Sequence, residues 1–198
     1  MSGERINDRL VNIRPHASTE QTAARLARTC IFGSMPIVPF DTLPNASRVW
    51  VFGSDRALSG VDAVRLLDEV DRFLGQWKAH GMPLTCARDW RDEHLLTIGV
   101  DSTRESASGC SIDGLFRVFQ GIERPLGTRI LGGGRVFYRD AAGHVQCVAR
   151  DRVGELAVSG AVTAATPVFD TSLTTAGEWR ERFEAPAGET WVGGLLRA

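Results

Sequence analysis

Two strand-like segments joined by only three residues place the strongest limit on the fold of this chain. The segments are LTCARDW (84–90) and HLLTIGVD (94–101), and residues 91–93 separate them. Apolar segments with so short a connection are typical of a β-hairpin, whose two strands are antiparallel. A second hairpin is expected in RVFYRDAAGHVQCVA (135–149), with its turn at AAG. The sequence therefore predicts a mainly antiparallel sheet.

The clearest helical pattern begins at Ser59, which can cap a helix with Asp62 three residues later. Apolar side chains then recur at helical spacing, and Gly81 is a residue type that ends helices. These apolar residues are Val61, Val64, Leu67, Val70, Phe73, Leu74 and Trp77. The opposite side of the pattern is charged, as is typical of a solvated face. We therefore expect a helix between Ser59 and Gly81 with one buried face.

The remaining segments complete a mixed pattern of helices and strands. Residues 48–54 and 166–173 are predicted strands. A helix is expected from about Ser111 to Gly121, and a short one after Thr174 or Thr175. This order of elements predicts a single compact α+β domain, in which helices cover one face of the antiparallel sheet.

Residues 1–45 are predicted to be an N-terminal extension of a domain that spans residues 46–198. Ser18 to Gln21 match a capping box, which predicts a short helix that reaches about Cys30. The following segment, GSMPIVPFDTLPNAS (33–47), contains three prolines and is expected to be an extended connector.

Length and composition exclude several classes of protein. A chain of 198 residues with 43% hydrophobic and 24% charged residues is typical of one globular domain. Its formal net charge of −1 supplies no overall field that attracts nucleic acid, so nucleic acid is not an expected partner. No apolar run approaches the roughly 18 residues of a membrane span, and the N-terminus lacks the apolar core of a secretory signal. We expect a cytoplasmic protein whose four cysteines are free and mostly buried.

The segment SGCSID (108–113) carries the candidate chemistry, because Cys110 is expected at the start of a helix. Unpaired N–H groups and the helix dipole stabilise a thiolate at such a position. A nucleophilic cysteine also needs a base, for which His80 and His94 are the candidates. Asp101 ends the preceding strand and could orient that base or bind a polar group of a ligand.

The residues around Cys110 are candidates for binding a ligand without covalent chemistry. Gly109 permits close approach of a ligand, and the backbone N–H groups near Ser111 and Asp113 could hold an anion. Ser108 or Ser111 could equally be the cap of the helix. In that alternative Cys110 is a packed residue, and we expect its sulfur to be buried against Ile98 and Val100 of the preceding strand.

Five segments together resemble an uncharacterised family of bacterial proteins that share an SGCSID core. They are WKAHG (77–81), the strand that ends at Asp101, SGCSID (108–113), FD (169–170) and PAGETW (186–191). The resemblance covers residues 47–120 and 165–191, and it implies no activity. Members of the family are sometimes labelled as ABC-transporter ATPases, but this chain has no G-x-x-x-x-G-K-[ST] motif to hold the phosphates of ATP.

No cofactor and no metal site are predicted. His144 and Cys147 lie three residues apart on a predicted strand, so their side chains point to opposite faces. Gly132 to Gly134 beside Arg135 could wrap a phosphate, although a glycine run before a strand is more often a turn. The G-x-S-x-G, H-E-x-x-H and G-x-G-x-x-G motifs are absent.

Two classes of function therefore stay open. The first is a small-molecule-binding domain or a thiol-dependent enzyme, centred on residues 101–113. The second is a non-catalytic protein-interaction or assembly module, indicated by the lack of a complete catalytic motif. In that case the proline-rich residues 35–45 would dock on a partner or on a second copy of the chain. Trp90 and Trp191 are expected to be partly exposed, where they would line a pocket or an interface.

Overall fold

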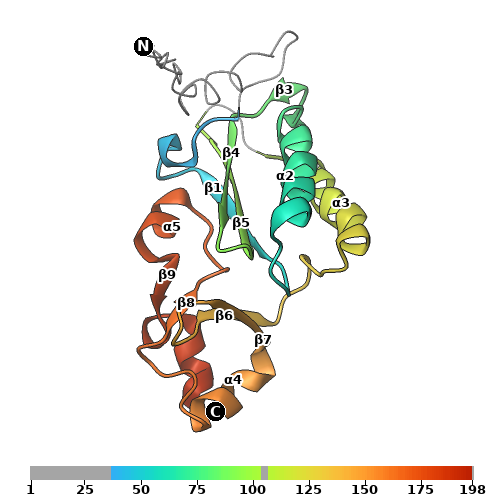
Figure 1. The fold of residues 1–198 in the computed structure, drawn as a ribbon. Helices are drawn as coiled ribbons and strands as arrows, with labels where there is room; N and C mark the ends of the chain where they lie inside the picture. The colour runs from blue at the N-terminus through green and yellow to red at the C-terminus, as the bar shows by residue number, and fades with distance from the viewer. Residues whose placement is uncertain (1–36, 104–106, 198) are drawn as a thin grey trace, which may run out of the picture. The chain divides into compact units, whose positions relative to one another are not determined.

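A computed structural model of the chain, which describes residues 37–103 and 107–197, has a compact mixed α+β fold (Figure 1). Its sheets are all antiparallel, as the two predicted hairpins require. The α+β prediction is therefore confirmed. The helix expected between Ser18 and Cys30 lies outside the described residues.

The first sheet has three strands in the order β1-β5-β4. The strands span Arg48–Gly53 (β1), Cys86–Arg91 (β4) and Leu95–Val100 (β5). The hairpin predicted around residues 91–93 is present, because β4 and β5 pair along their whole length. Its turn places Asp92 and Glu93 at φ angles of 51° and 58°. Because β5 is the middle strand, β1 and β4 each have one edge that no strand of this sheet covers.

Two long helices cover one face of this sheet. Figure 1 shows α2 (Gly60–Leu74) and α3 (Gly109–Leu126) side by side on the same side of its strands. Leu96, Ile98 and Val100 of β5 belong to the apolar core beneath them, together with Leu115 and Phe119 of α3. The arrangement agrees with the predicted helical layer on one face of the sheet.

The helix α2 is shorter than predicted and buries a different stripe. It ends at Leu74, and a short hairpin follows, with strands β2 (Lys78–Ala79) and β3 (Met82–Pro83). Leu66, Val70 and Leu74 are its buried side chains, whereas Val61 and Val64 are 83% and 58% exposed. With 3.6 residues per turn, the two valines fall on the side opposite Leu66.

The helix α3 is longer than predicted, because Gly121 does not end it. Gly121 is exposed in the middle of the helix, where glycine costs about 1 kcal/mol relative to alanine and is tolerated. The helix instead ends at Leu126, and Gly127 follows in the left-handed conformation with a φ of 60°.

The other face of the first sheet is covered by short elements from both ends of the described chain. Phe40 and Leu43, from the segment that the sequence analysis assigned to the extension, are buried there. The short helix α5 (Ala176–Arg182) contributes Trp179, whose Nε1 donates to Thr97 Oγ1 at 3.0 Å. Since Phe40 and Leu43 are part of this core, they are not free to dock on a partner.

The second sheet has four strands in the order β7-β6-β8-β9. The strands span Arg135–Arg139 (β6), Val145–Ala149 (β7), Pro167–Phe169 (β8) and Glu184–Pro186 (β9). The hairpin predicted for 135–149 is confirmed by the pairing of β6 with β7. The helix α4 (Val153–Val158) and the 3₁₀ segment Trp191–Arg197 pack near each other on this sheet's own apolar cluster.

Gly53 lies where the two sheets meet. A Cβ atom on this residue would lie 2.2 Å from Cζ of Phe137, a buried residue of β6. Real Cβ contacts are never so short, so only glycine allows β1 and β6 to approach this closely. The end of β1 is thereby held against the second sheet.

Replacing Gly53 by alanine should destabilise the protein by about 1–3 kcal/mol, the usual cost of overpacking a core. The control is Gly121→Ala on α3, where a Cβ atom has nothing within 4 Å. That change should stabilise the protein by about 0.5–1 kcal/mol, because alanine is the better helix former. Urea unfolding of both variants tests the pair, and equal free energies of unfolding would contradict the close approach at Gly53.

Candidate binding cleft

The catalytic candidates of the sequence analysis do not form one site. His94 and Asp101 flank opposite ends of β5, which is six residues long and so separates them by roughly 20 Å. The His94 side chain is buried, and its Nδ1 lies 3.0 Å from the carbonyl oxygen of Asp92 in the same turn. His94 therefore cannot act together with a group at the 101–113 end of the strand.

The residues proposed for ligand binding are used in local structure. Asp101 Oδ1 accepts from the N–H of Thr103, and Ser108 Oγ accepts from the N–H of Ser111 as the cap of α3. Ser111 Oγ in turn donates to the carbonyl of Ser108. Gly109 has open space around it, and Asp113 is exposed. The capping alternative is thus the one that these hydrogen bonds match.

The predicted burial of Cys110 is wrong. The residue is exposed, because α3 begins at Gly109 and turns Leu115 and Phe119 into the core. Cys110 precedes Leu115 by five residues, which places it well away from the buried side of the helix. His80 is also exposed, with a φ of 50° in the turn between β2 and β3, and no hydrogen bond joins it to Cys110 within the described residues.

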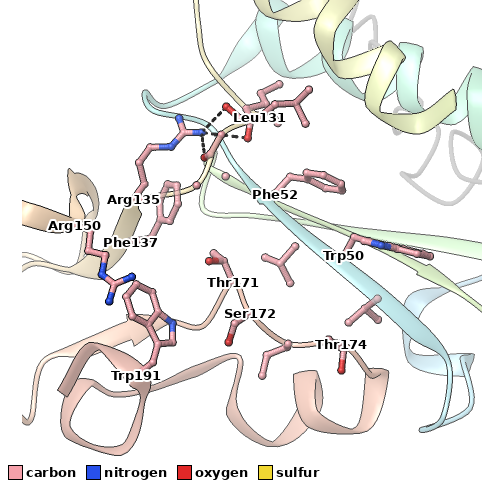
Figure 2. A pocket seen from close by; sticks show the side chains of 18 of the residues that line it. Trp50, Phe52, Leu131, Arg135, Phe137, Arg150, Thr171, Ser172, Thr174 and Trp191 are labelled. Carbon is pink, nitrogen blue, oxygen red and sulfur yellow. Dashed lines mark hydrogen bonds between the residues drawn. The ribbon is translucent and has the colours of Figure 1, made fainter. Parts of the chain in front are cut away.

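A cleft of about 730 Å³ lies along β1 instead (Figure 2). All six residues of β1 line it on one side. The remaining walls come from residues 130–135 and 171–174, with Phe116, Phe137, Arg150 and Trp191. The volume is within the roughly 300–1,000 Å³ of ligand pockets.

The glycine-rich wall of the cleft, residues 130–134, is held from behind. The guanidinium of Arg135 donates to the carbonyls of Arg129, Ile130, Leu131 and Gly132, and Figure 2 shows three of these bonds. Glu123 Oε1 accepts from the N–H groups of Ile130 and Leu131, both at 2.6 Å. Arg135 is therefore engaged in fixing this wall, and its Nη1 and Nη2 groups are used within the chain and not for a phosphate held by the glycine run.

Asp55 fixes the chain just before the glycine-rich wall. Its carboxylate accepts from the hydroxyl of Thr128 at 2.7 Å and from the backbone N–H of Arg129 at 2.9 Å. Burial raises the pKa of Asp55, but these two hydrogen bonds and the Arg129 guanidinium outweigh it and lower the pKa to about 2. Asp55 is therefore ionised at neutral pH.

The opposite wall, residues 171–174, is held by two carboxylates. Asp170 is buried and accepts from the N–H and the hydroxyl of Ser172. Glu178 Oε2 accepts from the N–H of Thr174 at 3.2 Å, and this bond lowers the pKa of Glu178 below its usual value. Both acids act on the backbone of the wall, and neither lines the cleft.

Two arginines at the cleft lie on tryptophan rings. The guanidinium carbon of Arg48 is 4.9 Å from the ring centroid of Trp50, and that of Arg150 is 5.4 Å from the ring centroid of Trp191. Neither guanidinium makes an ion pair within the described part of the chain. Stacking on an aromatic face orients an arginine while it leaves the N–H groups at its edge available.

The charge of the cleft is one-sided. Arg48, Arg135 and Arg150 line it, and no Asp, Glu or Lys does so among the described residues. The Nε1 atom of Trp191 is buried and has no hydrogen-bond partner in residues 37–103 and 107–197, although a buried donor without an acceptor costs about 1–3 kcal/mol. The positive charge of the lining favours an anionic ligand.

The sequence signals for this cleft were partial. Trp191 was expected to be partly exposed and to line a pocket or an interface, and it is half-buried at the cleft. The glycine run before Arg135 was noted as a possible anion site. Sequence reasoning did not bring Arg48, Trp50 and Arg150 together, because Arg150 lies 102 positions after Arg48 and no local motif relates them.

Other kinds of site are not supported within the described residues. No cluster of three His, Cys, Asp or Glu side chains there could hold a metal ion. No helix in that part of the chain has the length and hydropathy needed to cross a membrane. Comparison of the chain with protein-family models, with curated proteins and with solved structures finds no match.

The low pKa of Asp55 makes the wall that it holds sensitive to pH. A carboxyl whose folded pKa lies below its unfolded value of about 3.9 adds stability above that pH and loses it as the pH falls to about 2. Asp55→Asn should therefore lower the free energy of unfolding at pH 6 by roughly 1–2 kcal/mol, reduced by partial exposure.

The deficit of Asp55→Asn should shrink between about pH 4 and pH 2. Urea unfolding across this pH range measures it, and Asp113→Asn on the exposed side of α3 is the control substitution. If the deficit in the free energy of unfolding stays constant down to pH 2, the loss does not come from the charge of the Asp55 carboxylate.

The cysteines differ in exposure and should differ in stability effects. Cys86 is 2% exposed, and burial raises the pKa of its thiol to about 11. Cys86→Ala should cost about 1–3 kcal/mol, because it leaves a void in the core and removes the thiol that donates to the carbonyls of Leu74 and Leu84 at 3.5 Å. Cys110→Ser and Cys110→Ala should both stay within about 0.5 kcal/mol of the parent, as exposed substitutions do.

Maleimide labelling followed by mass mapping gives an independent readout of the same difference. Cys110 should react in the folded protein, and Cys86 only after unfolding. Protection of Cys110 in the folded protein would contradict its exposure.

Proposed function

We propose that this protein is a non-catalytic binding module that holds an anionic partner in the cleft along β1. The one-sided charge of the cleft carries the proposal: three arginines line it without an acidic residue among the described residues, while the whole chain has a net charge of −1. Because the chain as a whole has no net positive charge, it does not attract anions over its entire surface. Acidic partners would instead be selected at the cleft, where the arginines complement their negative charge.

A protein partner fits this site better than a small metabolite. The cleft follows the whole length of β1, and its two free guanidinium groups come from β1 and from the segment after β7. Tryptophan and arginine are the residue types that contribute most to protein interfaces. The partner that we infer is therefore a short acidic peptide segment, in keeping with the interaction-module alternative.

The thiol-dependent alternative has less support. Asp101 follows β5 and Cys110 lies in the first turn of α3, but His94 lies at the other end of β5, and no hydrogen bond joins His80 to the thiol within the described residues. Membership of the family with the SGCSID core stays a prediction, and it assigns no activity. A cytoplasmic location likewise remains a proposal.

A blocked, fluorescein-labelled heptapeptide of alternating Glu and Val tests acidic-peptide binding, with fluorescence anisotropy as the readout. The peptide should bind the full chain and weaken as NaCl rises from about 50 to about 300 mM, because salt screens exposed charges. A Lys-Val peptide of the same length should not bind. Equal binding of the two peptides would remove the charge argument.

Arg48→Gln and Arg150→Gln should each weaken binding of the Glu-Val peptide by about two- to fivefold, the effect of an exposed ion pair of up to about 1 kcal/mol. Arg65→Gln is the matched control, since Arg65 is exposed on α2 and does not line the cleft. If Arg65→Gln weakens binding as much as the other two, the site is not this cleft.

A further inference from the structure

We propose, on the basis of the binding function above, that the acidic segment binds as an added β-strand along the free edge of β1. Backbone hydrogen bonds of β1 would then give affinity, and the arginines at the cleft would select acidic side chains. This assigns the backbone of Val49 and Val51 a role in recognition.

The register of the first sheet shows which backbone groups of β1 are free. Ser54 donates its N–H to His94 at 2.8 Å, in continuation of the pairing of β1 with β5. Val49 donates its N–H away from β5, to the carbonyl of Thr174 at 2.9 Å. Because hydrogen-bonding direction alternates along an antiparallel strand, even-numbered residues of β1 bond to β5 and odd-numbered residues face outward.

The edge of β1 that faces away from β5 is paired only at its N-terminal end, and the rest of this edge has no partner strand within the described residues. Ser47 accepts from the N–H of Ala176, and Val49 donates to Thr174, which makes a single bridge between Arg48 and Thr175. The next rung of this ladder would use the carbonyl of Val49 and the N–H of Val51. The N–H of Thr174 instead donates to Glu178, and the chain leaves β1 there.

Three backbone groups of β1 are left facing the cleft between its two anchored ends. They are the carbonyl of Val49 and the N–H and carbonyl of Val51, and none has a partner within the described residues. Edge groups of this kind are a template for pairing with another extended chain. The cleft along β1 provides the room that such a chain needs.

Charge decides between the candidate occupants. Residues 1–36 of this chain contain five arginines and three acidic residues, so their positive balance does not match the arginines of the cleft. An acidic segment of another protein does match them, with Arg48 on β1 and Arg150 across the cleft available to its carboxylates. The occupant is therefore an extended acidic peptide.

A scan of N-methyl groups through the Glu-Val heptapeptide tests strand addition. In an added strand every second N–H points at β1. Methylation at those positions should weaken binding at least tenfold, and methylation at the intervening positions should change it less than threefold. A uniform effect along the peptide would overturn strand addition. No binding of the unmodified peptide would instead overturn the proposed function.

Val51→Pro tests the same inference from the protein side. Proline removes the outward N–H of Val51 but no hydrogen bond to β5, so the edge strand tolerates it. We expect an unchanged circular dichroism spectrum and at least tenfold weaker peptide binding. The control is Ala149→Pro at the edge of the second sheet, where the backbone φ is already −67°. Binding by this control should stay within twofold of the parent.

An anion without a peptide backbone separates strand addition from simple charge binding. If tripolyphosphate binds the cleft as tightly as the peptide, and if Val51→Pro weakens neither, strand addition is wrong although anion binding stands. If Val51→Pro weakens only the peptide, strand addition is supported. Should Val51→Pro fail to fold, the N-methyl scan still decides the inference.

Discussion

The burial of β5 on both faces is the constraint on which the rest of the structure depends. All six of its residues are buried between β1 and β4. Leu96, Ile98 and Val100 face the layer of α2 and α3, while Leu95 and Thr97 face the core that holds Trp179. A strand that is buried on both faces favours the central position. In a sheet of three strands, β1 and β4 are then the two edge strands.

The position of β1 at the edge explains both the cleft and the way its walls are held. Gly53 allows the end of β1 to touch Phe137 of the second sheet, and Thr174 pairs with the other end. Between these two anchors the edge is open. The acidic residues nearby, among them Asp55 and Glu178, bind backbone N–H groups of the walls, which leaves Arg48 and Arg150 without carboxylate partners in the described chain.

Much of the fold could be predicted from local pattern. The hairpin at residues 91–93 follows from its short connection, and the short helix predicted after Thr174 or Thr175 is α5, which Thr175 caps. The errors have local causes as well. Gly121 is a helix-ending residue type only where the backbone leaves the helix, and helical spacing could not tell that Val61 lies opposite the stripe of α2 that meets the sheet. Cys110 was predicted to be buried, but it lies five positions before Leu115 in α3, on the side of the helix that faces away from the core.

The sequence by itself determined the two hairpins and the α+β class, because each depends on residues a few positions apart. Only the tertiary structure decided the site. Arg48 and Arg150 stand 102 positions apart and become neighbours of one cleft only when β1 packs beside the second sheet. Whether a backbone N–H on β1 is free depends on which strand pairs with which edge, and no local pattern carries that information.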